Sequence, residues 1–160
     1  MAEQWQLRKG STAENNGFVG AEGELTYDTT TKAVHVHDGE TAGGALIDTV
    51  VAFQLPTSSN SYTWYRKYAS GWVEQGGIWT GSISAASGSD GHITINLPVT
   101  MTDTNYCVNI TNNSGTGTTT VWEMWNVESL TTNQFGIHMG AYANTRTITR
   151  MNWEVKGMAA

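Results

Sequence analysis

The chain has 160 residues, of which 14 are acidic and 8 are basic, and its net charge is −6. Because the basic residues are scattered, the composition excludes an extended nucleic-acid-binding surface. No apolar run approaches the ~20 residues of a membrane span and the N-terminus has no signal-peptide core, so we expect no membrane insertion and a product that stays soluble in the cell that makes it.

The chain is long enough for one domain or two small modules. It is 39% hydrophobic and 14% charged, with 18 Gly and 2 Pro, a composition that favours an all-β fold. The single cysteine, Cys107, excludes an intrachain disulfide and a cysteine-based zinc site. Within NYCVNI we expect it to be a small apolar core residue.

The first elements are a strand and a hairpin. Residues 4–7 alternate polar and apolar and predict a strand ended by Gly10, and residues 12–23 are rich in turn formers. Residues 23–44 then predict a β-hairpin that turns at TTTK and stops at Asp38-Gly39. With a side-chain period of two, His35 and His37 share one strand face and the neighbouring valines take the other.

Residues 45–55 are apolar almost throughout and fit either a helix or a strand. The polar stretch 56–61 begins with Pro56 and is the best module boundary. We therefore expect an N-terminal module over residues 1–55, a linker over 56–61 and a C-terminal module over 62–160.

The C-terminal module reads as short strands separated by Gly, Ser, Thr and Asn, with a hairpin turn at Ala69-Ser70-Gly71. No convincing helix interrupts them, so the pattern predicts an antiparallel β-sandwich or barrel-like knob. The expected strands are residues 62–68, 71–75, 78–84, 92–97, 106–111, 120–127, 135–140 and 147–157.

Two resemblances follow from motifs. The first ~50 residues carry LRKGS, NNGFVG, GELTYD and HDGETAGG and resemble the N-terminal domain of the phage major tropism determinant, a segment that recurs in bacteriophage tail fibres. The second module carries YTWYRKYASGWVEQGG, INLPVTMTDTNYCVNI and WEVKG, and resembles a C-terminal domain of phage and prophage tail fibres.

The resemblances imply a trimeric virion protein with a β-prism-like N-terminal module, made in the bacterial host cytoplasm. That module would attach to the tail, the baseplate, a fibre shaft protein or its own trimer. The C-terminal knob would bind a saccharide or an outer-membrane protein on the host. The alternatives are a structural fibre accessory without its own receptor and a polysaccharide-cleaving tailspike.

The strand at residues 121–127 has two largely apolar faces, to which Trp122, Met124 and Trp125 contribute. Such a strand must bury its second face, because one face of a small antiparallel sheet normally meets water. These side chains therefore fill either a subunit interface or a tight single-chain core.

Three axial copies of His35 and His37 would offer six imidazole nitrogens, an octahedral shell suited to a first-row metal such as iron or nickel. The alternative is that His37 bonds backbone within the His-Asp-Gly turn of the resemblance. The sequence predicts no cofactor, and this axial metal ion is the one candidate set against that prediction.

The sequence predicts no enzyme. Polysaccharide cleavage needs two carboxylates about 5–10 Å apart, whereas Glu74 belongs to a hairpin motif and Glu123 has no visible partner. Receptor contacts are instead expected on two polar loops, residues 112–119 and 140–146. Their candidate residues are Asn113, Tyr142, Asn144 and Arg146.

Overall fold

The computed structural model describes residues 6–86, 88–116, 122–142 and 146–160. Within these ranges the side chains are described except at residues 113–125 and 141–146. Contacts divide the chain into unit 1, Met1–Ala52 with Lys67–Ser70, and unit 2, Phe53–Arg66 with Gly71–Ala160.

The predicted all-β class is confirmed, since strands dominate both units. No helix in the described ranges is long and apolar enough to cross a membrane. The module boundary at 56–61 stays a prediction.

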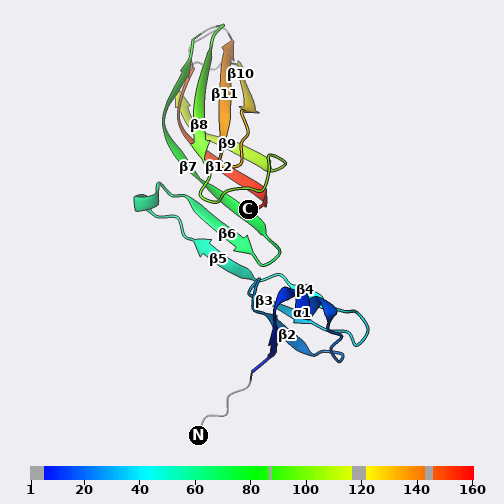
Figure 1. The fold of residues 1–160 in the computed structure, drawn as a ribbon. Helices are drawn as coiled ribbons and strands as arrows, with labels where there is room; N and C mark the ends of the chain where they lie inside the picture. The colour runs from blue at the N-terminus through cyan, green and yellow to red at the C-terminus, as the bar shows by residue number, and fades with distance from the viewer. Residues whose placement is uncertain (1–5, 87, 117–121, 143–145) are drawn as a thin grey trace. The chain divides into compact units, whose positions relative to one another are not determined.

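Unit 1 holds one sheet in the order β1-β2-β3-β4 (Figure 1). Its strands are β1 (Arg8–Gly10), β2 (Leu25–Asp28), β3 (Ala33–Val36) and β4 (Ala45–Ile47). The predicted hairpin is confirmed, because β2 and β3 pair antiparallel, while β1 joins β2 in parallel. The first strand begins later than predicted, since β1 ends at Gly10 but starts only at Arg8.

The turn-rich reading of residues 12–23 missed a short helix, α1 (Thr12–Gly17). Ser11 caps it by accepting from the backbone N–H of Glu14, whose carboxylate accepts from the Ser11 N–H in return. The sequence Ser-Thr-Ala-Glu was therefore a capping box, a local signal for a helix start.

Residues 45–55 form strands rather than a helix, because β4 is followed by β5 (Val50–Gln54). The remaining elements are η1 (Ser58–Asn60), β6 (Trp64–Tyr68), β7 (Trp72–Ala85), β8 (Asp90–Asn96), β9 (Cys107–Thr116), β10 (Trp122–Glu128), β11 (Gln134–Tyr142) and β12 (Arg146–Met158). They build a three-stranded sheet, β10-β11-β8, and a five-stranded sheet, β5-β6-β7-β12-β9, with all the recorded pairings in unit 2 antiparallel.

The predicted sandwich in unit 2 is confirmed. Its core lies between the two sheets (Figure 1), since fully buried side chains come from β11 on one side and from β7 and β12 on the other. They include Phe135, Ile137, Met139, Val73, Ile148, Met151 and Val155. Burial alternates along β12 from Met151 to Met158, so every second side chain of this stretch points away from the core.

Two local expectations differ from the structure. Cys107 is exposed rather than buried, because the inward position of β9 is taken by its neighbour Val108, which packs against the core. The two strands expected at 71–75 and 78–84 are one strand, β7, since Gly76 and Gly77 continue the strand instead of breaking it. The predicted turn before β7 is confirmed, with Gly71 at φ 88°.

Candidate functional site

The structure shortens the two predicted receptor loops. Asn113 lies within β9, β11 runs to Tyr142, and β12 begins at Arg146, so these residues are on strands. Asn144 and the side chains of the other three lie outside the described residues. A receptor role for this end of unit 2 stays a prediction.

Trp122, Met124 and Trp125 are on β10, as expected, and pair with β11. Their side chains lie outside the described part of the chain, so their place at an interface or in the core stays a prediction.

The two histidines of unit 1 have partners within that unit. His37 is buried, its Nδ1 accepts the Gly20 N–H at 3.2 Å, and its Nε2 lies 3.0 Å from Thr26 Oγ1. Because Nδ1 is the acceptor, Nε2 carries the proton and donates to Thr26. His35 Nδ1 donates to the Gly43 carbonyl at 2.8 Å. His37 thus has no nitrogen left for a metal ion, which favours the alternative that its ring bonds backbone.

Two carboxylates in the motifs that carry the N-terminal resemblance form hydrogen bonds within unit 1. Asp28 Oδ1 accepts the Thr30 and Thr31 amides, and its Oδ2 accepts the Thr12 hydroxyl at 2.7 Å. Burial pushes the Asp28 pKa upward, but these hydrogen bonds outweigh burial and hold it below its ordinary value. Asp38 likewise bonds Thr41, which lowers its pKa. Asp28 and Asp38 therefore stabilise turns within unit 1.

An open groove of about 480 Å³ lies on the outer face of the five-stranded sheet of unit 2. Cross-strand register builds its floor: Asn152 of β12 lies opposite Ile78 of β7 and Thr111 of β9, and Glu154 lies opposite Asn109 in the next outward row. The aromatic side of the groove consists of Tyr62 and Trp64, beside Pro56. Trp153 also borders the groove, but its ring is buried in the core against Phe135.

Gly76 leaves room for the Trp64 ring in this groove. A Cβ at Gly76 would lie 2.9 Å from the Trp64 indole and 2.6 Å from the Trp153 carbonyl oxygen. Only glycine leaves room for both, which explains an uninterrupted strand through Gly-Gly. Trp64 and Gly76 belong to the sequence motif, but only the strand register shows that Gly76 lies opposite Glu154 of the groove.

The groove's carboxylate belongs to an ion-pair network. Lys156 Nζ lies 3.3 Å from Glu154 and 3.7 Å from Glu74, and Glu154 is the main cause that raises the Lys156 pKa. The three side chains are one third or so exposed, so solvent screens them and their effect on stability is small. The arrangement offers rings, amides and a hydroxyl to a polar ligand.

Comparison with known proteins places the N-terminal segment. Residues 6–41 match the family described as the major tropism determinant N-terminal domain. The predicted resemblance of this segment is therefore confirmed. The tail fiber receptor-binding protein of Bordetella phage BPP-1 is 50% identical over 44 residues, which are 28% of this chain and 12% of that protein. The chain thus spans about an eighth of this curated relative's length.

Two solved structures are also similar. The P3c variant of the major tropism determinant shares 31% identity over 39% of this chain and 20% of its own, with a TM-score of 0.26. An N-truncated R2-type pyocin tail fiber shares 16% identity over 68% of this chain and 39% of its own, with a TM-score of 0.43.

Proposed function

We propose that the chain is a tail-fibre protein of a phage or prophage that attaches the virion to the bacterial surface. The observation that carries the proposal is the match of residues 6–41 to the tropism determinant domain, together with 50% identity to a tail fiber receptor-binding protein. In this arrangement the module of residues 1–55 docks to the tail, to a fibre shaft protein or to its own trimer, and residues 62–160 meet the host.

The groove on the five-stranded sheet is the proposed receptor contact, and a surface saccharide is the ligand class that fits it. An indole face such as that of Trp64 packs against the apolar face of a sugar ring, while Asn109 and Asn152 both donate and accept hydrogen bonds to hydroxyls. Glu154 and Glu74 flank one lysine, so they are held as ion-pair partners. This supports binding rather than cleavage.

A homotrimer is the proposed assembly. Leu46, Ile47, Val50 and Val51 of unit 1 are each about two fifths exposed, and Phe53 and Leu55 further along the chain are 64% and 67% exposed. Six large apolar side chains exposed within ten residues of sequence are unusual for a monomer and typical of an interface. A structural fibre accessory without its own receptor is the second candidate.

The test is adsorption of the labelled full chain to a panel of bacterial strains and to purified lipopolysaccharide. For a strain that binds, Trp64→Ala should weaken binding about tenfold, the equivalent of one lost ring contact. Asn152→Ala, at an exposed position, reports on the same groove without touching the packing of Trp64. Trp72→Ala is the matched control, since Trp72 is a partly exposed tryptophan that does not line the groove.

If Trp64→Ala and Asn152→Ala bind like the Trp72→Ala control, the groove is not the receptor site. If the parent chain binds no strain and no lipopolysaccharide, the accessory role replaces adhesion as the proposed function.

A further inference from the structure

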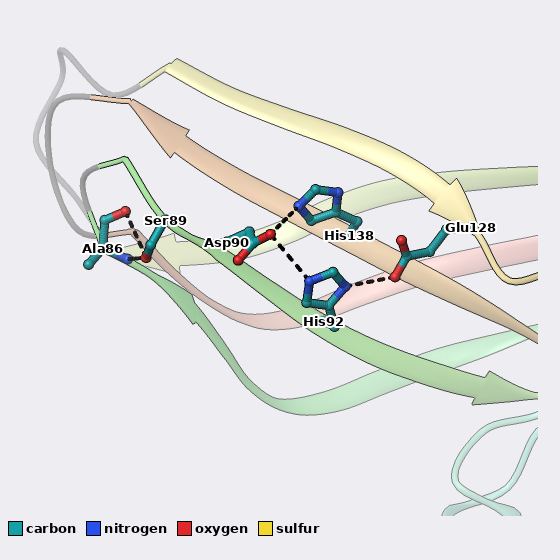
Figure 2. A network of polar contacts seen from close by, with 6 residues as sticks. All are labelled: Ala86, Ser89, Asp90, His92, Glu128 and His138. Carbon is teal, nitrogen blue, oxygen red and sulfur yellow. Dashed lines mark hydrogen bonds and ion pairs between the residues drawn. The ribbon is translucent and has the colours of Figure 1, made fainter.

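Unit 2 carries a second group of polar side chains, on the outer face of its three-stranded sheet (Figure 2). His92 of β8 and His138 of β11 are direct cross-strand partners. Their rings stack, with centroids 4.6 Å apart and planes 7° from parallel. Asp90 precedes His92 by two residues and so shares its face.

These three side chains bring possible metal ligands together. Asp90 Oδ2 lies 3.1 Å from His138 Nε2 and 3.4 Å from His92 Nε2. One ligand atom from each residue lies within 4.8 Å of the others. Two imidazole nitrogens and one carboxylate oxygen form the ligand set that Zn²⁺ accepts in three-ligand sites that keep an open position.

Glu128 of β10 supports the group from the other side. Its Oε1 lies 2.7 Å from His92 Nδ1, while Nε2 of the same ring faces Asp90 (Figure 2). A carboxylate on the remote nitrogen fixes the tautomer that leaves Nε2 free to ligate, and it makes that nitrogen a better donor. Glu128 thus supplies the outer-shell partner that histidine ligands of metals usually have.

We propose that Asp90, His92 and His138 bind one divalent transition-metal ion of the Zn²⁺ type, with Glu128 orienting His92. Metal binding requires the ring nitrogens that face Asp90 to be unprotonated. The lone pairs of two stacked, parallel rings do not converge on one point. Metal binding therefore requires His92 and His138 to rotate until one nitrogen of each ring points at the ion. The exposed fractions of His92, 53%, and His138, 30%, leave room for that rotation.

The site is distinct from the axial pair predicted at His35 and His37. It needs a single chain, so it predicts one ion per chain rather than one per three chains. The metal site also does not depend on the proposed adhesion. Its ligands lie on β8 and β11, and none of them lines the groove.

The experiment titrates the full chain, without a histidine tag, with ZnCl₂ in a calorimeter. We expect saturable binding of one ion per chain. His138→Gln and Asp90→Asn should each weaken it at least tenfold, and Glu128→Gln by a smaller factor, in line with the roughly 10- to 100-fold effect of an outer-shell partner. His35→Gln is the matched control and should leave Zn²⁺ binding unchanged. Co²⁺ in place of Zn²⁺ should give the d–d absorption of a four-coordinate ion.

Three results would overturn the proposal. One is a parent chain that shows no saturable Zn²⁺ binding. Another is a His92→Gln/His138→Gln double variant, folded by circular dichroism, that binds Zn²⁺ like the parent. The third is loss of binding in the His35→Gln control, which would place the ion in unit 1.

Discussion

The Gln75 side chain is a buried polar group that fastens a loop to the sandwich of unit 2. It is fully buried, its Oε1 accepts the Val99 N–H at 2.8 Å, and its Nε2 donates to the Val99 carbonyl at 2.9 Å. Nε2 also lies 3.1 Å from the Met101 sulfur. The amide thus satisfies both backbone groups of a residue that has left strand β8.

Gln75→Leu should destabilise the protein by about 2 to 4 kcal/mol. The substitution keeps the volume but leaves the Val99 N–H and carbonyl without their partners, each at a cost of about 1 to 3 kcal/mol. The added apolar burial offsets part of that loss. Urea unfolding followed by tryptophan fluorescence should show a lower midpoint at an unchanged slope.

Gln75→Glu adds a dependence on pH with a definite sign. A neutral carboxyl donates through its O–H and accepts through its other oxygen, as the amide does, whereas a carboxylate only accepts. Burial therefore raises the pKa of the introduced group above the unfolded value of ~4.3. The variant should be near parental stability below that pH. It should lose about 1.4 kcal/mol per unit of raised pKa as pH rises through the folded value.

Gln134→Leu is the control, because Gln134 is only half-buried on β11 and accepts the Tyr106 hydroxyl with its backbone carbonyl rather than its side chain. The reasoning fails if Gln75→Leu costs no more than this control. It also fails if Gln75→Glu is equally stable, relative to the parent, at pH 4 and pH 7.

Two further predictions concern unit 1. Asp28→Asn should remove part of the acid sensitivity of this unit: the Asp28 pKa is lowered by folding, so its contribution is present above the unfolded value of ~3.9 and lost as pH falls toward the folded value. Amide NMR signals of Thr30 and Thr31 across that pH range measure this, and identical acid transitions in both proteins would refute it. If the chain is the proposed homotrimer, Val51→Asp should turn it into monomers by charging an exposed apolar strand. Light scattering measures the mass, and a monomeric parent would contradict the trimer itself.

Local signals in the sequence predicted most strands. Period-two alternation and turn residues identified the β2–β3 hairpin, and the expected positive φ at Gly71 is present. Strand ends were predicted wrongly where a residue type occurs both in turns and inside strands. Because glycine favours turns, the pattern predicts a strand end before Gly76, whereas the structure shows that Gly76 makes room for a neighbouring carbonyl and an indole within the strand.

Burial of a single position was harder to predict than strand existence. The alternation of β9 can place either Cys107 or Val108 inward, and a shift by one residue exchanges them. The outcome depends on how β9 pairs with β12, where Val108 lies opposite the core residue Val155. That pairing joins segments nearly 50 residues apart, and no local pattern encodes it.

Neither the groove nor the histidine group could be predicted from local sequence patterns, and the reason is the same. His92 and His138 each lay in a predicted strand, and alternation alone makes His92 an outward residue, but only the antiparallel register of β8 and β11 sets the two rings opposite each other. Asn152, Ile78 and Thr111 meet in the same way across three strands. Sequence periodicity therefore selects which side chains face outward, whereas strand order decides which of them can bind one ligand together. Both proposed sites lie on such outer faces, because the inner faces are filled by the sandwich core.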